Sequence, residues 1–402
     1  MNTAKWSKKK LIAFSIITLL FIFLVIEIIF RVIFFIQYKK YHTSVYTQGN
    51  TIQKSDTGLI FMNRPFYLDF EKKHQYNEEG MKSEPGEVFM PEKKEDDFWV
   101  FLLGGSAMEG MGSNKNGEWF DITGAEDYPA NQTIASILEK KLQVAMPSKQ
   151  VKVFNAANSA YCISQVIKRY QKLNTKYKAD WIVSLDGNNE PVFTSEDSSV
   201  WDLMSRDWKD NQTFKFPLKY IIPFTSHSAF INQLKQSLYH FKLSRRIKKN
   251  KETNFPAKLK WSAVKDQSLL YATDSFFAQK MTDTFYYYLN KFDTILNNNN
   301  QHHLLLIQPH LSLRDATVVN TTEKALFNYY CHSSNNPVFN SYYRKIYSLY
   351  DSLAKNKSTI RLLQDMHSLK EQIFLDYCHF TPNANEYLAS YIADIITNKR
   401  PI

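Results

Sequence analysis

The apolar stretch over residues 11–30, LIAFSIITLLFIFLVIEIIF, limits the architecture of this chain more than any other feature. Glu27 is its only charged residue, and a helix of this length spans about 30 Å, the thickness of the hydrocarbon core of a bilayer. A cleaved signal peptide is the alternative, but its apolar region is shorter, about 7–15 residues, and a small-residue cleavage site follows it. Here RVIFFIQYKK follows instead. The sequence therefore predicts a transmembrane anchor over residues 11–37.

Basic residues flank this segment on both sides, and more of them precede it. Four lysines lie ahead of it and three basic residues behind it: Lys5, Lys8, Lys9 and Lys10, then Arg31, Lys39 and Lys40. Cytoplasmic flanks carry an excess of Lys and Arg, so we expect residues 1–10 to form a cytoplasmic tail. The bulk of the chain would then be periplasmic or extracellular.

Glu27 lies four residues before Arg31. This spacing and order allow the two side chains to pair on one face of a helix near the membrane interface. A functional carboxylate inside the membrane is the alternative interpretation.

The net charge of +11 does not indicate a nucleic-acid partner, because more than half of the excess positive charge falls within the first 40 residues. The basic run KLSRRIKKNK at 242–251 is either a solvated helix end or a contact for anionic lipid or acidic glycan. Three cysteines, Cys162, Cys331 and Cys378, are too few for a disulfide framework or a zinc site. One disulfide with one free thiol remains open.

Strand and helix patterns alternate through much of the chain after residue 95. An apolar run ends at Leu103, and periodic helical segments separate it from later apolar runs at 151–154, 181–185 and 304–307. This alternation predicts an α/β fold with three layers, in which helices cover both faces of a parallel sheet. Residues 38–94 read as a membrane-proximal segment of short strands and turns. We expect one domain over 95–402, with an insertion at about 195–270 that forms a lid or a partner surface.

Polar and small residues follow the predicted strands. In open α/β sheets, functional residues gather at the carboxyl ends of the strands. Four segments lie in such loops or just before the last helix: GGS ending at Ser106, NAANSA at 155–160, GNN at 187–189, and DYCH at 376–379. Together they supply a serine nucleophile, amide donors, and a histidine with a carboxylate three residues away. The small residues around Ser106 would leave room for a substrate carbonyl.

In this order, the four segments resemble the four sequence blocks of the SGNH (GDSL-like) hydrolase superfamily. Gly104-Gly105-Ser106 is a variant of the first block that its membrane-anchored esterase and O-acyltransferase branch often shows. Ala160 stands where the second block has glycine, and Gly187-Asn188-Asn189 stands in place of glycine-asparagine-aspartate. The fourth block, aspartate-x-x-histidine, matches Asp376 and His379.

The resemblance implies an SGNH/flavodoxin-like fold and a catalytic set of Ser106, His379 and Asp376. It also implies an oxyanion hole built from the Ser106 and Ala160 amides and the Asn188 side chain, with no metal and no cofactor. The thiols of Cys162 and Cys378 lie beside two of the blocks, where they either pack in the core or form a mutual disulfide, with a nucleophilic role as a further alternative. His310 either lines the pocket or lies on the surface.

We therefore expect a membrane-anchored, extracytoplasmic serine esterase or O-acyltransferase. It would add or remove acyl groups, with acetyl the expected one, on a cell-envelope glycan or lipid. A multi-pass acyltransferase or another envelope protein is an expected partner. The alternative is a catalytically degenerate protein that keeps the fold as a docking subunit of an envelope assembly, and both Ala160 and the aromatic-rich insertion favour that alternative.

Overall fold

The computed structural model describes residues 7–38, 52–54, 61–63, 75–84, 86–110, 128, 130–159, 161–190, 230, 275–315, 317–327, 347–348 and 357–398. Ala160 and Cys331 lie outside the described residues, as do the basic run at 242–251 and all of the 195–270 insertion except Phe230.

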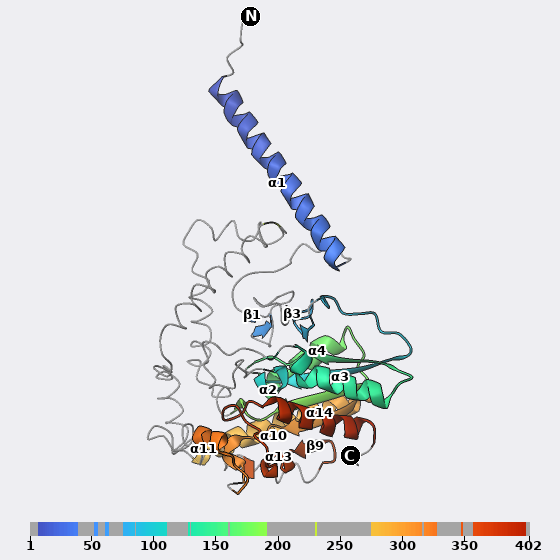
Figure 1. The fold of residues 1–402 in the computed structure, drawn as a ribbon, viewed down its shortest axis with the longest axis vertical. Helices are drawn as coiled ribbons and strands as arrows, with labels where there is room; N and C mark the ends of the chain where they lie inside the picture. The colour runs from blue at the N-terminus through green and yellow to red at the C-terminus, as the bar shows by residue number, and fades with distance from the viewer. Residues whose placement is uncertain are drawn as a thin grey trace, which may run out of the picture.

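Helix α1, Lys8–Tyr38, carries the apolar segment and stands apart from the sheet and its helices (Figure 1). Among the described residues it is the one helix long and apolar enough to cross a membrane, over Lys8–Ile33. The predicted pairing on its surface is present, because Arg31 Nε donates to Glu27 Oε1 at 2.8 Å. The second oxygen of Glu27 accepts from the backbone N–H of Phe230 at 3.1 Å, and the Phe230 ring packs against Phe23 and Phe30. One residue of the insertion therefore contacts the apolar helix.

A mixed sheet forms the body of the molecule, and the described part of it has seven strands in the order β3-β4-β6-β5-β7-β8-β9. The last five of these are parallel: β6 (Gln150–Asn155), β5 (Asp97–Gly104), β7 (Trp181–Asp186), β8 (His302–Ile307) and β9 (Ile360–Leu362). Counted along the chain, their order is 2-1-3-4-5, as in flavodoxin-like folds. The predicted α/β fold class is confirmed.

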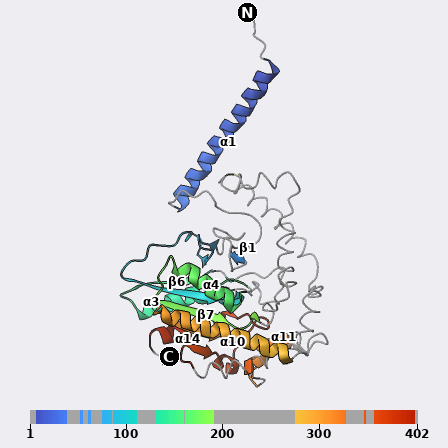
Figure 2. The ribbon, with the colours of Figure 1, turned by 180° about the vertical axis from the view of Figure 1, so that it is seen from behind.

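Two pairs of helices cover the two faces of this sheet. Helices α3 (Ile134–Ala145) and α14 (Pro382–Ile396) lie on one face, and α4 (Ile163–Asn174) and α10 (Ser275–Asn298) lie on the other (Figure 2). Successive side chains of a strand point to opposite faces. In β5, Val100 and Leu102 accordingly pack with α3 and α14, whereas Trp99 and Phe101 pack with α4 and α10. Because both faces are buried, the strand reads as a continuous apolar run.

The sheet extends into the segment that precedes residue 95. Strands β3 (Gln75–Tyr76) and β4 (Lys82–Ser83) form an antiparallel hairpin, and β4 pairs antiparallel with β6. Polar contacts with α4 and the turn after it hold the hairpin. The backbone carbonyl of Glu79 accepts from Arg169 Nη2 at 2.5 Å, and Glu79 Oε1 accepts from Lys176 Nζ at 2.6 Å and the Tyr177 hydroxyl at 3.0 Å. The hairpin is thus part of the folded body.

The remaining described elements are short. Strands β1 (Ile52–Lys54) and β2 (Phe61–Asn63) pair with each other in a separate antiparallel ribbon. The short helices are α2 (Ser106–Glu109), η1 (Ala130–Gln132), η2 (Leu311–Leu313), α11 (Thr321–Phe327) and α13 (Asp365–Ser368). Of these, α2 matters most for function because it begins at Ser106.

Candidate active site

The candidate site lies where the strand order reverses. Strand β5 runs between β6 and β7, and the chain leaves these neighbouring strands toward opposite faces of the sheet. Crevices at such switch points are the usual ligand sites of open α/β sheets. Ser106 follows β5 directly as the first residue of α2, and Asn188 follows β7. Two of the predicted site residues therefore come from the ends of adjacent strands.

The two glycines before Ser106 are required by β7. Gly104 has a φ of +142°, and a Cβ there would lie 2.5 Å from the backbone oxygen of Leu185. A Cβ on Gly105 would lie 2.6 Å from Asn189 Nδ2. The immediate reason for these small residues is therefore close packing against the neighbouring strand and its loop, in addition to any room that they leave for a substrate.

Ser106, His379 and Asp376 are joined in one chain of hydrogen bonds. Ser106 Oγ lies 2.7 Å from His379 Nε2, and His379 Nδ1 lies 2.6 Å from Asp376 Oδ2. The other oxygen of Asp376 accepts from the backbone N–H groups of Cys378 at 2.8 Å and His379 at 2.7 Å. The structure thus brings together the nucleophile, base and carboxylate that the sequence proposed, across 273 positions between Ser106 and His379.

Electrostatics separates the two ionisable groups of this chain. Burial by itself would raise the pKa of Asp376, but His379 and the two backbone donors hold it below its ordinary value of 3.8. Burial likewise would lower the pKa of His379, but the Asp376 carboxylate raises it well above the ordinary 6.5. A charged carboxylate beside a basic imidazole is the arrangement that a general base requires.

Asp376 and His379 lie on a closed turn that leads into α14. Phe374 and Phe380 form an antiparallel bridge, the N–H of Leu375 donates to the carbonyl of His379 at 2.8 Å, and the N–H of Thr381 donates to the carbonyl of Ile373 at 2.8 Å. The Thr381 side chain then caps α14 by accepting from the N–H of Ala384. This turn fixes the two side chains relative to the sheet.

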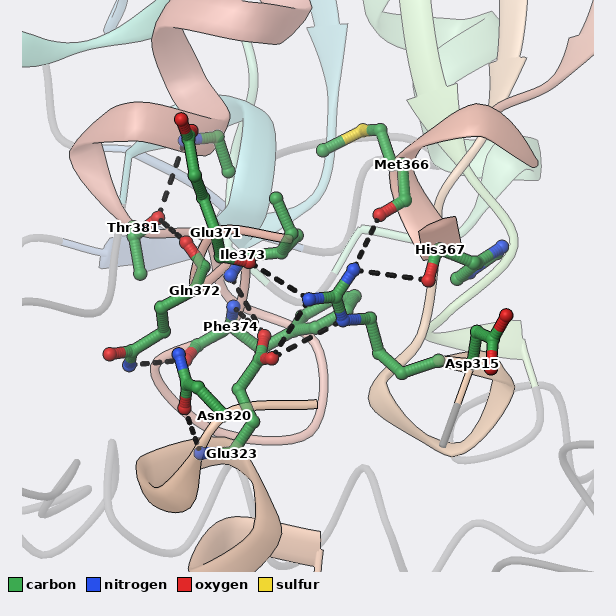
Figure 3. A network of polar contacts seen from close by, with 12 residues as sticks. Asp315, Asn320, Glu323, Met366, His367, Glu371, Gln372, Ile373, Phe374 and Thr381 are labelled. Atoms are coloured by element: carbon green, nitrogen blue, oxygen red, sulfur yellow. Dashed lines mark hydrogen bonds and ion pairs between the residues drawn. The ribbon is translucent and has the colours of Figure 1, made fainter. Parts of the chain in front are cut away.

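A buried ion pair holds the base of this turn (Figure 3). Arg314 and Glu323 meet at 3.0 Å, and neither side chain is exposed to solvent. The other guanidinium contacts are to backbone carbonyls, those of Met366, His367 and Glu371. The second carboxylate oxygen, Glu323 Oε1, accepts from the N–H groups of Ile373 at 2.8 Å and Phe374 at 3.1 Å. The pair therefore ties the segment before Asp376 to the α11 region.

Asn188 and its neighbours form the third loop of the site. Asn188 is buried, and Asn189 Nδ2 donates to the backbone oxygen of Tyr161 at 3.0 Å, which connects this loop to the one after β6. Glu190 adds a second connection, since its Oε1 accepts from the N–H of Ile163 at 2.7 Å at the start of α4. Burial raises the pKa of Glu190 to about 7. Sequence reasoning missed Glu190, whose only signal is its position directly after the Asn188-Asn189 pair. The predicted donor at Ala160 lies outside the described residues.

The cysteines and His310 were left with alternatives by the sequence. Cys162 and Cys378 are buried free thiols, so the mutual disulfide is wrong. Cys378 Sγ lies 3.6 Å from His379 Nδ1, and burial raises the pKa of this thiol to about 11. Ser106, and not a cysteine, occupies the side of the imidazole that can take a proton. His310 is wholly buried, with Nδ1 accepting from the N–H of Ser312 at 3.1 Å, so it is not a surface residue.

The donor atoms of Asp376, Cys378 and His379 lie within 4.8 Å of one another, close enough for a metal ion among the described residues. The same Nδ1 and carboxylate oxygens make the hydrogen bonds of the Ser106 chain. A metal ion there would have to displace those bonds.

No protein-family model matches the sequence, and no curated protein gives a match. Among solved structures, an acetyl xylan esterase matches with 12% identity over 74% of this chain and 100% of that chain, at a TM-score of 0.36. A carbohydrate acetylesterase family member from Sinorhizobium meliloti matches with 10% identity over 74% and 97% of the two chains, at a TM-score of 0.33. A candidate GDSL-like lipase from Parabacteroides merdae matches with 10% identity over 77% and 99%, at a TM-score of 0.31. Likenesses at this level assign no activity, so we base the functional proposal on the geometry of the site.

The buried Arg314–Glu323 pair predicts a large stability effect. Arg314→Met leaves the Glu323 carboxylate buried without its counter-charge, so we expect a loss of about 3–5 kcal/mol in the free energy of unfolding. Adding Glu323→Gln should recover part of this loss, because the neutral amide oxygen still accepts from the backbone of Ile373 and Phe374. Urea unfolding of the detergent-solubilised protein measures both. Equal stability of the single and double variants would contradict the ion-pair explanation.

Proposed function

We propose that this protein is a membrane-anchored, extracytoplasmic serine esterase or O-acyltransferase that acts on acyl esters of the cell envelope. The observation that carries the proposal is the continuous hydrogen-bonded chain from Ser106 through His379 to Asp376. A serine hydroxyl is a weak nucleophile until an adjacent base takes its proton. Here the base lies 2.7 Å away and is oriented by a buried carboxylate.

The geometry supports a two-step acyl transfer. His379 Nε2 takes the proton of Ser106 as Oγ attacks the ester carbonyl, and Asp376 stabilises the imidazolium that forms. Backbone donors at the start of α2 and the Asn188 amide would stabilise the tetrahedral oxyanion, together with the amide that the resemblance assigns to Ala160. The intermediate collapses when the leaving alkoxide receives the proton from His379, which leaves an acyl ester on Ser106. An acceptor hydroxyl, from water or a sugar, then gives its proton to His379 and takes the acyl group.

Helix α1 supports an envelope substrate, because a tethered site acts on molecules at the membrane surface. We propose acetyl as the acyl group and an envelope glycan or lipid as the substrate. Where the acceptor is a sugar hydroxyl, a multi-pass acyltransferase would supply the acyl group to this chain. The assembled Ser106 chain favours an enzyme over a protein that keeps the fold only for docking.

Ser106→Ala is the direct test. Removing Oγ should lower turnover of a short-chain aryl ester by about three orders of magnitude or more, because the remaining donors cannot replace a covalent step. Labelling by a fluorophosphonate probe should disappear as well. The matched control is Ser390→Ala, an exposed serine of α14 whose hydroxyl contacts only the Glu386 carbonyl among the described residues. Wild-type protein that takes no label, together with full cellular function of Ser106→Ala, would replace the enzyme proposal with the docking one.

The pH profile tests His379 as the base. Since Asp376 raises the pKa of His379 well above 6.5, the imidazole is protonated and inactive at low pH, and kcat/KM should rise with pH. The midpoint of the rise should lie above the ordinary value of about 6.5. Asp376→Asn removes the charge that raises this pKa, so the midpoint should move down while the rate falls. A profile that stays flat between pH 5 and 9, with chemistry rate-limiting, would rule out His379 as the base.

The anchor proposal has a separate test. A reporter enzyme fused after residue 402 should be active only when it requires export, and the full-length protein should stay in the membrane fraction after carbonate washing. The lysines ahead of residue 11 set this orientation, so replacing Lys8, Lys9 and Lys10 with glutamine should weaken it. Release of a soluble product that begins near residue 40 would show a cleaved signal sequence instead.

A further inference from the structure

A buried glutamate of the serine helix joins three separate segments of the molecule. Glu109 is the last residue of α2, three positions after Ser106, and only 2% of its surface is exposed. One carboxylate oxygen accepts from the Tyr76 hydroxyl at 2.6 Å, and the other accepts from the Ser159 hydroxyl in a short contact. The carboxylate thus spans from β3 to the loop after β6. None of these contacts takes part in the chemistry of the Ser106 chain.

Ser159 is the residue immediately before position 160, where the resemblance places an oxyanion-hole amide. Its side chain is held by Glu109, and its carbonyl oxygen accepts from Asn158 Nδ2 at 3.2 Å. A peptide unit is planar, so holding the carbonyl on one side sets the direction of the N–H on the other side. Asn158 is itself fixed, because its backbone N–H donates to the carbonyl of Gly104 at 3.0 Å. The contacts of Ser159 therefore control the orientation of the peptide that follows it.

Tyr76 brings the segment between the apolar helix and residue 95 into this arrangement. It is buried in β3, and its hairpin is held against α4 by the Glu79 contacts with Arg169, Lys176 and Tyr177. The hydroxyl of Tyr76 is consequently a fixed donor, and it reaches Glu109 across 33 positions of sequence.

We propose that Tyr76 and Glu109 are positioning residues, which hold Ser159 and thereby set the oxyanion-stabilising amide of the loop after β6. The order of action is Tyr76 to Glu109 to Ser159. The inference rests on the proposed acyl-transfer function, to which it adds residues that touch neither the substrate nor the reacting atoms. A carboxylate is needed in the middle, because two hydroxyl donors require an acceptor on each oxygen. The amide nitrogen of glutamine cannot accept, so Glu109→Gln leaves one hydroxyl without its acceptor.

The expected kinetic signature is a loss in kcat at nearly constant KM, because an oxyanion donor acts on charge that develops in the transition state. Complete loss of such a donor lowers kcat by about 10²–10³-fold. Displacement of the loop should cost less, so we expect about tenfold for Tyr76→Phe and about 10–100-fold for Glu109→Gln. The KM of the same aryl ester should stay within about twofold, as expected when ground-state binding is unaltered.

The matched control is Tyr177→Phe. It removes a tyrosine hydroxyl that also donates to a glutamate, Glu79, and that also holds the hairpin, but it has no contact with the loop after β6 among the described residues. If Tyr76 acted only by stabilising the hairpin, both variants would change kcat equally. We expect Tyr177→Phe to keep wild-type kcat.

A double-variant cycle tests the order of action. If Tyr76 works through Ser159, then Tyr76→Phe should lower kcat about tenfold in the wild-type background and leave it unchanged when Ser159→Ala is already present. Additive losses, or no loss from Tyr76→Phe alone, would overturn the proposal. Wild-type turnover that Ser106→Ala does not abolish would instead contradict the proposed function.

Hydrogen exchange of the full-length protein in detergent tests the positioning without any assay of activity. A peptide covering the loop after β6 should exchange about tenfold faster in Tyr76→Phe and Glu109→Gln than in wild type, and at the wild-type rate in Tyr177→Phe. Unchanged exchange in Glu109→Gln would overturn the proposal whatever the enzyme does.

Discussion

The close approach of β5 to β7 at Gly104 is the constraint on which the candidate site depends. Parallel pairing sets Gly104 opposite Leu185, and the Leu185 carbonyl occupies the space that any side chain on Gly104 would need. The positive φ of Gly104 also lets the chain turn sharply into α2. Ser106 and Asn188 therefore emerge within a few residues of the same register. A side chain at Gly104 would move the two strands apart and separate the nucleophile from the third loop.

Buried carboxylates hold the loops that surround this point. Glu109 holds the loop after β6, Glu190 joins the loop after β7 to the start of α4, and Glu323 holds the segment before Asp376. Loops at the end of a sheet lack the regular partners of strands and helices, and their buried N–H groups still need acceptors. A carboxylate offers two acceptor oxygens and can therefore serve two donors at once. The same residue type thus solves the same problem at three places.

Much of the fold could be predicted from sequence because its signals are local. The apolar run of β5 and the helical spacing in α3 each fall within a dozen residues, and Asp376 and His379 are three positions apart. The partners of Glu109 and Glu323 lie 33 to 52 positions away or more, so no window of sequence joins them. Strand β9, with three residues, is too short for a periodic pattern. The hairpin at residues 75–83 carries no sustained period either, and only its pairing with β6 shows that it belongs to the sheet.

Two aspartates of equal burial show how local donors assign a charge. Asp376 and Asp186 are both buried, each at the end of a segment that leads into a site loop. Burial raises the pKa of Asp186 well above 3.8, the charge of Glu190 adds to this effect, and neither oxygen of Asp186 meets a donor atom at hydrogen-bond distance among the described residues. Asp376 instead receives two backbone N–H groups and the His379 ring, and its pKa falls below 3.8. Environments that push the pKa values of similar groups apart identify which of them carries charge at neutral pH. Asp376 is therefore the carboxylate that can stabilise an imidazolium, whereas Asp186 stays protonated and electrically silent beside the Asn188 loop.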